Sequence, residues 1–503
     1  MLLDGLKLLA SDDAADRVAY GRDLWPRHHL GVRSGRLPAG PAAIVWPRST
    51  EEVAEVVAWA RKRSVALVPF GAGSGVCAGV LPSSDAVVVD LKRMARWRRF
   101  DRGAPLLDVE SGHMGLPLEE RLNREGFTLG HFPSSILCST VGGWVAARSA
   151  GQASGYYGKI EDMVVALECV TGRGDVVTLR QRATGPSLLP LVIGSEGTLG
   201  IITSVTLRLH PAPAARAFAA WSFDSTREGW QAMRALFQRG LRPAIARLYD
   251  PFDAMLAKQG SAKRRTHTGP HAPGAGSAVL RTMLRNPAAL NALLATRSFT
   301  RAAGGAMLVV IFDGAGDDAE ANAERARAIV EPMGARYEGE GPAQKWLAHR
   351  YSVSYRQAPA IAAGLFIDTM EVAAPWAKLG ELYEGVLRAV GPHAFIMAHF
   401  SHAYPDGCCI YFSFAGSASP DGGPWDAACE QTYDQTWRRA LDAVLAAGGT
   451  IAHHHGVGRS KAPRMDRELG SGGIAVARAV KRAFDPDGIL NPGALLPPEE
   501  ARP

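Results

Sequence analysis

The stretch Ser139–Ala146, S-T-V-G-G-W-V-A, decides how this chain is interpreted. Glycines and small residues dominate it, which makes it too polar and too irregular for a helix of the core. It is preceded by P-S-S at 133–135 and leads into G-Q at 151–152, Y-G at 157–158 and I-E-D-M-V at 160–164. Glycine carries no side chain, so its backbone can approach another group closely. The sequence therefore predicts a segment whose backbone lies close to another group.

Two further glycine-rich loops flank this segment. Pro69–Gly75, P-F-G-A-G-S-G, directly follows a predicted strand, and its glycines allow backbone N–H groups to converge on a phosphate. No helix with the dinucleotide-fingerprint spacing follows it, and taken alone it is equally consistent with a tight turn. The third loop, Ile193–Ile202, has the sequence I-G-S-E-G-T-L-G-I-I and leads into another strand. Three such loops on one scaffold predict an extended ligand held between two lobes.

The remaining pattern divides the chain into domains. Its 503 residues exceed what one hydrophobic core supports, so we expect at least two domains. Residues 1–40 are expected to form an N-terminal arm and residues 41–212 an α/β block, which P-A-P at 211–213 ends. Residues 213–447 alternate helices with apolar strands, and residues 448–503 form a C-terminal segment.

The start of the α/β block shows strand–helix–strand alternation. Apolar runs at 42–46, 65–70 and 86–90 predict strands. Between the first two, Ser49 has capping-box spacing to a glutamate and predicts a helix that ends near Arg63. This alternation indicates a small α/β lobe.

Composition excludes several classes of protein. The chain is 47% hydrophobic and 21% charged, as globular domains are. No stretch reaches the roughly 18 consecutive apolar residues of a membrane span, and the acidic N-terminus lacks the pattern of a signal peptide. Six cysteines without a CxxC pair indicate reduced thiols, so we expect a cytoplasmic protein.

The net charge of +7 is modest, but basic residues are concentrated in one region. No acidic residue occurs between Ala254 and Phe312, and no nucleic-acid-binding motif accompanies the basic residues there. Pro287–Arg301 is amphipathic and cationic at one end, so a helix is expected. We expect this region to be a solvated loop, or alternatively a peripheral contact with a membrane surface.

Together, the three loops resemble the FAD-binding domain of vanillyl-alcohol oxidase-type flavoproteins, in the same order along the chain. The resemblance returns at Phe484–Gly493, F-D-P-D-G-I-L-N-P-G, which is similar to the family's closing motif. It implies an α+β fold, with a two-lobed FAD-binding domain, an α/β substrate or cap domain, and a C-terminal segment that returns to the flavin. The implied FAD is non-covalent, because the phosphate loop offers no histidine.

The resemblance assigns the cofactor-binding residues by their place in the family's motifs. They are Pro69, Gly71, Ala72, Gly73, Ser74, Gly75, Pro133, Ser139, Thr140, Gly142, Gly143, Trp144, Ala150, Gly151, Tyr157, Gly158, Glu196, Gly197, Gly200, Ile201 and Ile202.

Branches of the family differ in the residues over the flavin. D-2-hydroxy acid dehydrogenases carry H-x-G-D-G-N-x-H and a later E-H-G-x-G, in which two histidines and a glutamate bind a metal. This chain has H-A-Y-P-D-G-C-C from His402 and H-H-H-G-V-G from His453, so one histidine and the glutamate are replaced. We therefore predict no metal site.

The same departures resemble the alkyldihydroxyacetonephosphate synthase branch, which carries G-x-C-I-Y-F and H-H-H-G-V-G. E-V-A-A-P-W from Glu371 is similar to that branch's E-T-S-A-P-W. The implied reaction exchanges the acyl chain of acyl-dihydroxyacetone phosphate for a fatty alcohol through a covalent adduct at flavin N5, without net redox change. A homodimer is expected from the same resemblance.

The resemblance also assigns roles around the substrate. Tyr411 would be the catalytic acid/base, and the run His453, His454 and His455 would line the site. Three residues would bind the substrate, of which the two arginines suit a phosphate: Arg247, Arg356 and His131. A phenol beside cationic groups is expected to ionise more readily and to abstract a proton next to the ketone.

Each assignment has a structural alternative. A tyrosine in an apolar strand is commonly a core residue with a satisfied hydroxyl, and lone arginines are commonly surface residues. Adjacent histidines on an extended segment point to alternate faces, so at most two of the three could converge. The alternative function is an FAD-linked oxidoreductase of a 2-hydroxy acid or alcohol, and a third is an FAD-binding protein without activity.

Overall fold

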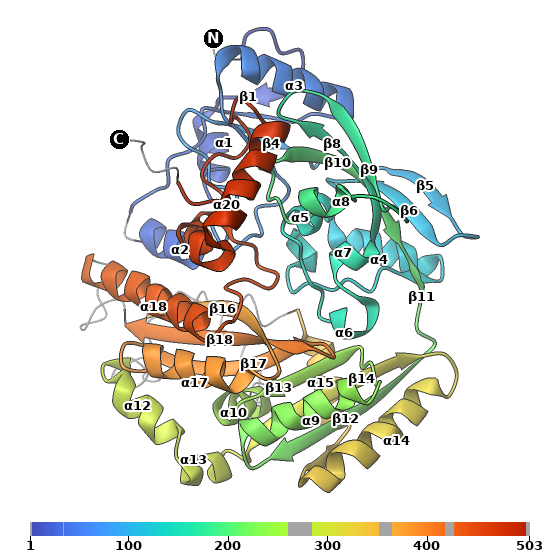
Figure 1. Ribbon diagram of the computed structural model, residues 1–503, viewed down its shortest axis with the longest axis vertical. Helices are drawn as coiled ribbons and strands as arrows, with labels where there is room; N and C mark the ends of the chain where they lie inside the picture. The colour runs from blue at the N-terminus through green and yellow to red at the C-terminus, as the bar shows by residue number, and fades with distance from the viewer. Residues whose placement is uncertain (1–2, 34, 260–283, 352–364, 418–426, 499–503) are drawn as a thin grey trace, which may run out of the picture. The chain divides into compact units, whose positions relative to one another are not determined.

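The computed structural model describes residues 3–33, 35–259, 284–351, 365–417 and 427–498 (Figure 1). Two compact units are present. Unit 1 comprises Met1–Gly151, Tyr157–Ala212 and His454–Pro503, and unit 2 comprises Gln152–Tyr156 and Pro213–His453. Arg356 and part of the basic region, residues 260–283, lie outside the described residues.

Unit 1 contains a four-stranded sheet in the order β1-β2-β4-β3. Its strands are β1 (Ala10–Ser11), β2 (Ala43–Val45), β3 (Leu67–Phe70) and β4 (Val87–Asp90). Helix α3 (Thr50–Arg63) begins as predicted, because Ser49 Oγ accepts the N–H of Glu52 at 3.3 Å. Its residues Val53, Val56 and Val57 share a buried cluster with Val87 and Val89 of β4.

A second sheet of unit 1 has the order β5-β6-β10-β8-β9. Its strands are β5 (Trp97–Asp101), β6 (Leu106–Glu110), β8 (Val164–Thr171), β9 (Val176–Arg180) and β10 (Gly200–Arg208). A two-stranded sheet pairs β7 (Phe127–Thr128) with β11 (His210–Pro211). The helices of unit 1 are α1 (Ala14–Ala19), α2 (Pro26–Arg33), α4 (Gly115–Arg124), α5 (Val141–Ala146), α7 (Ile160–Met163), α8 (Leu189–Val192), α19 (Gly458–Lys461) and α20 (Met465–Phe484).

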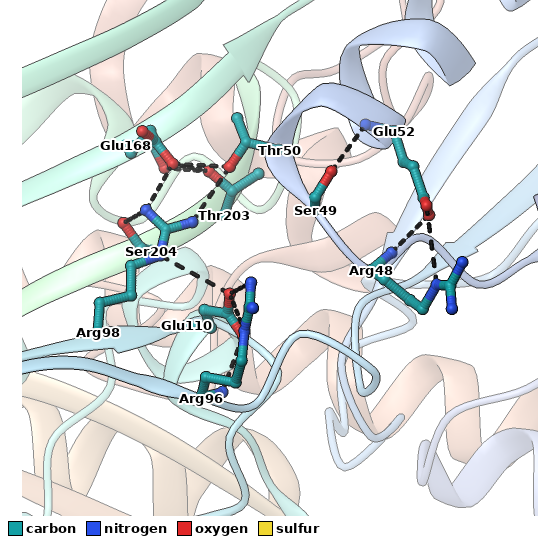
Figure 2. Close-up of polar contacts among 10 residues, drawn as sticks. All are labelled: Arg48, Ser49, Thr50, Glu52, Arg96, Arg98, Glu110, Glu168, Thr203 and Ser204. Carbon is teal, nitrogen blue, oxygen red and sulfur yellow. Dashed lines mark hydrogen bonds and ion pairs between the residues drawn. The ribbon is translucent and has the colours of Figure 1, made fainter.

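An ion-pair network links the second sheet to the start of α3 (Figure 2). The Glu110 carboxylate is fully buried and accepts the backbone N–H of Arg96 and its guanidinium, each at 2.8 Å. Arg98 lies between Glu110 (3.7 Å) and Glu168 (2.9 Å). Thr50, the first residue of α3, donates its hydroxyl to Glu168 at 2.7 Å.

Glu110→Ala is expected to lower the free energy of unfolding by about 2 kcal/mol, because it removes hydrogen bonds from charged donors to a buried acceptor. Urea unfolding followed by tryptophan fluorescence measures the change. Glu125→Ala is the matched control, since Glu125 pairs with Arg102 at the surface, where such pairs contribute little. Equal midpoints for the two variants would contradict a stabilising role for the network.

Unit 2 contains a seven-stranded antiparallel sheet in the order β15-β12-β14-β13-β17-β18-β16. Its strands are β12 (Ala215–Phe223), β13 (Ile245–Tyr249), β14 (Ala306–Gly314), β15 (Arg336–Gly339), β16 (Leu365–Pro375), β17 (Phe395–Ala403) and β18 (Gly407–Ser417). Its helices are α9 (Thr226–Gln238), α10 (Pro251–Gln259), α12 (Pro287–Leu294), α13 (Arg297–Ala302), α14 (Asp318–Val330), α15 (Gly341–His349), α17 (Leu379–Val390) and α18 (Ala427–Ala446). The short helix α6 (Ser154–Tyr157) begins in unit 2 and ends at the first residue that returns to unit 1.

Helices α9 and α17 cover one face of this sheet (Figure 1). Trp230 of α9 and Tyr383 of α17 each pack against Phe400 of β17, with ring centroids 5.5 and 5.6 Å apart. Because side chains alternate along a strand, the neighbours of Phe400 point to the other face. That second face carries the polar residues described below.

Two local predictions are wrong. Pro287–Arg301 is not one helix: α12 ends before Ala295, and the Thr296 hydroxyl caps α13 by accepting the N–H of Phe299 at 3.2 Å. The stretch Ser139–Ala146 does contain a buried helix, α5. It packs there because Gly142 has no side chain, and a Cβ at this position would lie 2.6 Å from Ser111. None of the described helices combines the length and apolar character needed to cross a membrane.

Candidate active site

The three glycine-rich segments come together in unit 1. A Cβ on Gly71 would lie 2.4 Å from Thr140 Oγ1, so the first loop contacts the second segment directly. A Cβ on Gly197 would lie 2.9 Å from Pro69 Cγ, so the third loop packs against the first. The N–H of Glu196 also donates to Ala146 O at 2.9 Å. Glycine at these positions is therefore required by close approach of the segments.

The first loop, Gly71–Gly75, directly follows β3. Among the described residues, none accepts a hydrogen bond from the backbone N–H groups of Gly71–Gly75, which include Ala72 and Ser74. Gly73 adopts a left-handed conformation, φ +65°, which favours glycine. Lys92 Nζ lies beside the loop, 2.9 Å from Gly71 O. Successive free amides next to a cation form a concave anion site.

The second segment is held by its own side chains. Thr140 caps α5 by accepting the N–H of Gly143 at 3.3 Å, and Ser139 Oγ accepts Trp144 Nε1–H at 2.7 Å. Burial lowers the pKa of His131 to about 3, so this histidine is neutral. Its Nε2 lies 2.8 Å from Ser149 Oγ, and its ring is 4.8 Å from the Trp144 ring.

The rest of the second segment is close-packed. Pro133 and Ala150 are buried, and a Cβ on Gly151 would lie 2.4 Å from the backbone nitrogen of Phe132. Tyr157 is also buried and packs on His210, with ring centroids 5.0 Å apart. Gly158 has φ +89°, a conformation that favours glycine.

In the third loop, Glu196 uses its carboxylate to hold the C-terminal segment. It accepts the N–H groups of Val457 (2.5 Å) and Gly458 (2.8 Å), while Asn491 Nδ2 donates to the Glu196 carbonyl at 2.7 Å. Burial raises the pKa of this carboxyl, and the two amides oppose the shift. Gly200, Ile201 and Ile202 then begin β10, where Ile201 belongs to the hydrophobic core.

Unit 2 carries a row of polar residues across four adjacent strands. Tyr249 of β13 pairs with His399 of β17, His399 pairs with Tyr411 of β18, and Tyr411 pairs with Glu371 of β16. This row occupies the face opposite α9 and α17. Helix α10 packs against β13 and β17, and its Asp253 Oδ2 lies 3.2 Å from His399 Nδ1.

Tyr411 lies between two histidines. Its ring stacks on His399, with centroids 4.6 Å apart and an interplanar angle of 18°. Its hydroxyl lies 2.9 Å from His402 Nε2. Burial raises the pKa of Tyr411 well above the usual value, and Arg247 opposes this shift without cancelling it. The expectation that nearby cations ease its ionisation is therefore wrong: desolvation has the larger effect.

Arg247 lies on β13, on the same face as Tyr249. Its Nε is buried and has no hydrogen-bond partner among the described residues, and its Cζ lies 5.1 Å from the Tyr249 ring centroid. Burial raises the pKa of Asp253 to about 6, and Arg247 opposes this shift. A half-buried guanidinium with donor capacity left over can bind an anion.

The histidine run is divided at the boundary of the two units. His453 belongs to unit 2, where its ring lies 5.5 Å from the His402 ring. The backbone N–H of His453 donates to Glu371 Oε2 at 2.6 Å. His454 and His455 belong to unit 1, and their rings are 4.7 Å apart. Glu371, Cys409 and His453 offer ligand atoms within 4.8 Å of one another, a spacing that one metal ion could bridge. We assign no ligand there, and the absence of a metal stays a prediction.

Comparison with known proteins gives one family model for each of two parts of the chain. The model of the FAD binding domain matches residues 41–180, and that of FAD linked oxidases, C-terminal domain, matches residues 212–495. The alkyldihydroxyacetonephosphate synthase of Trypanosoma brucei brucei is 30% identical over 520 residues, covering 98% of this chain and 80% of that protein. The chain belongs to the alkyldihydroxyacetonephosphate synthase family.

A solved structure and one further relative are also similar to this chain. A solved structure of alkyldihydroxyacetonephosphate synthase is 27% identical with a TM-score of 0.74, covering 96% of this chain and 82% of that one. The uncharacterized FAD-linked oxidoreductase YgcU of Escherichia coli is 28% identical over 484 residues, covering 92% of this chain and 90% of that protein. The predicted α+β fold, with a two-lobed FAD-binding domain of the vanillyl-alcohol oxidase type and a second domain, is confirmed.

FAD is the cofactor of this family member, and unit 1 fits it. The free amides of Gly71–Gly75 suit the pyrophosphate. Several buried polar atoms of unit 1 have no protein partner among the described residues and could meet a polar cofactor. They are Ser111 Oγ, His131 Nδ1, Ser195 Oγ, Ser460 Oγ and Asn491 Oδ1.

His399 and Asp253 were not predicted as site residues from the sequence, and His402 was given no role there. The alternation of side chains in Phe395–Ala403 predicts that His399 lies on the face opposite Phe400. His402, three residues later, would then be expected on the opposite face. No pattern in the sequence predicts that both contact Tyr411.

Proposed function

We propose that this flavoprotein is an alkyldihydroxyacetonephosphate synthase-like transferase, which exchanges the acyl chain of acyl-dihydroxyacetone phosphate for a fatty alcohol. The observation that carries the proposal is the half-buried Tyr411 phenol, held between His399 and His402 beside Arg247. Family membership supports it at 30% identity over nearly the whole chain.

Each group in unit 2 has a task in this reaction. The Arg247 guanidinium binds the phosphate and fixes the ketone relative to the phenol. The Tyr411 oxygen takes a proton from the carbon next to the ketone and later returns it. The packed side chains around Tyr411 exclude water that would compete with the alcohol. FAD, when bound, supplies a ring that can form and break a covalent bond without net redox change.

A second function, oxidation of a 2-hydroxy acid or alcohol, is favoured by the likeness to the oxidoreductase YgcU. One anaerobic experiment separates the two. The FAD-loaded protein is given acyl-dihydroxyacetone phosphate and a fatty alcohol, and flavin absorbance and ether product are followed together. We expect ether without loss of flavin absorbance. Bleaching of the flavin by the alcohol, or by a 2-hydroxy acid added in a parallel sample, with no ether, would support the oxidoreductase instead.

We also propose that the FAD is bound without a covalent link, since the loop Pro69–Gly75 contains no histidine or cysteine. Acid precipitation of the purified yellow protein is expected to leave all flavin in the supernatant. A yellow pellet that retains its flavin after washing in denaturant would contradict this prediction.

A further inference from the structure

Tyr411 is the first member of a chain of hydrogen-bonded groups within unit 2. Its hydroxyl lies 2.9 Å from His402 Nε2, and His402 Nδ1 lies 2.9 Å from Ser154 Oγ. Ser154 Oγ in turn lies 3.0 Å from the Tyr404 hydroxyl. One assignment of hydrogens lets every group donate: Tyr411 to His402, His402 to Ser154, and Ser154 to Tyr404. His402 is then a neutral imidazole with Nε2 as acceptor.

His402 reaches Tyr411 through an irregularity of the backbone. Ser401 pairs with Cys409 and Ala403 with Cys408, so His402 is the extra residue of a β-bulge. Its φ of +49° lies in the left-handed region, which non-glycine residues rarely adopt. Without the bulge, alternation would direct His402 toward the helix-covered face with Phe400. Strain of this kind persists where the surroundings hold it, often at functional sites.

Ser154 comes from a distant part of the sequence. Residues Gln152–Tyr156 lie between two stretches of unit 1, yet they belong to unit 2. Gly155 lets this segment approach β17 closely, because a Cβ there would lie 3.1 Å from Ala403 O. Ser154 and His402 are 2% and 5% exposed, so bulk water cannot readily exchange protons with them.

The Tyr411 phenol needs a neighbouring group that can take its hydroxyl proton. Burial keeps Tyr411 protonated near neutral pH, so it can accept a proton from carbon only as it releases its own. Several charged or titratable groups also face it: His399, Glu371, Cys409, Arg247 and Tyr404. Of the two histidines, only His402 is placed to take the hydroxyl proton, since His399 contacts the ring face.

We propose that His402 holds the proton of Tyr411 during turnover, with Ser154 and Tyr404 as positioning residues; this rests on the proposed function. The substrate C–H bond breaks and leaves its electron pair on carbon, while a new O–H bond forms at Tyr411. The former O–H proton of Tyr411 moves to His402 Nε2. Ser154 Oγ accepts the Nδ1–H of the resulting imidazolium, and the steps reverse when the proton returns. No electrons are gained or lost.

The test compares FAD-loaded wild type with His402→Gln, whose amide can still hydrogen-bond Tyr411 but cannot hold a proton. We expect kcat for ether formation to fall by about 10²-fold, with KM for acyl-dihydroxyacetone phosphate changed little and partial rescue by added imidazole. Ser154→Ala should lower kcat less, and Ser154→Thr should restore it. His349→Gln, an exposed change in α15, is the control. An unchanged kcat in His402→Gln would overturn the proposal.

A second measurement does not depend on the substrate. In protein labelled with ¹⁵N-histidine, the resonance that disappears in His402→Gln should shift in Tyr411→Phe and in Ser154→Ala. His402→Asn, with equal flavin content, guards against a folding defect of one variant. If wild type forms no ether, the proposed function fails, while a shifted resonance still supports the proton pair for another substrate. A His402 resonance that does not shift in Tyr411→Phe would overturn the proposed role of His402.

Discussion

Tyr411→Phe is expected to lower kcat for ether formation by about 10³-fold, equivalent to roughly 4 kcal/mol of transition-state stabilisation. The variant removes only the hydroxyl. The ring that stacks on His399 at 4.6 Å is kept, so packing in β18 should survive. Steady-state ether formation measures kcat, and bound flavin per chain measures folding.

Tyr337→Phe makes the same chemical change at a partly exposed position on β15 and should leave kcat unchanged. Flavin content should match wild type in both variants, because the cofactor segments lie in unit 1 and both tyrosines lie in unit 2. If Tyr411→Phe retains more than a tenth of the wild-type kcat, the phenol is not the acid/base, and the structural alternative of a core tyrosine stands.

Arg247→Met is expected to raise KM for acyl-dihydroxyacetone phosphate by about 10- to 100-fold, the loss of one charged hydrogen-bonding partner. Methionine keeps much of the aliphatic volume, so the change isolates the guanidinium. Inorganic phosphate should inhibit the wild type competitively and should inhibit the variant much less. Initial rates over a range of substrate and phosphate concentrations measure both effects.

A matched control for Arg247 is Arg388→Met, an exposed change on α17 with no expected effect. Arg247→Lys should recover only part of the affinity, because an ammonium lacks the forked geometry that fits a phosphate. The removal of Arg247 should also raise the pKa of Asp253 further, since the cation now opposes the effect of burial. If KM is unchanged while kcat falls, Arg247 acts on the chemistry and not on the phosphate.

The fold was predictable where the sequence carries a local signal. The capping pair at Ser49 predicted the start of α3, and short apolar runs predicted β2, β3 and β4. The glycine-rich loops predicted close backbone approach, and the structure shows it at Gly71 and Gly197. These signals depend on residues near one another in the chain.

The arrangement around Tyr411 was not predictable, because it depends on strand register and on one bulge. Register brings Tyr249, His399 and Glu371 into a row with Tyr411, and these residues are far apart in the sequence. The bulge turns His402 to the same face. Likewise, α5 packs closely on Ser111 because Gly142 has no side chain, a tertiary contact that composition cannot report.

The proposed exchange of the acyl chain for a fatty alcohol is best tested with a fatty alcohol labelled with oxygen-18. FAD-loaded wild type is incubated without oxygen with acyl-dihydroxyacetone phosphate and the labelled alcohol, and the products are analysed by mass spectrometry. We expect an ether that carries the label, a released fatty acid in equal amount, and unchanged flavin absorbance. If no labelled ether forms, or if the flavin is reduced as a fatty aldehyde accumulates, the transferase proposal is contradicted and an oxidoreductase is indicated.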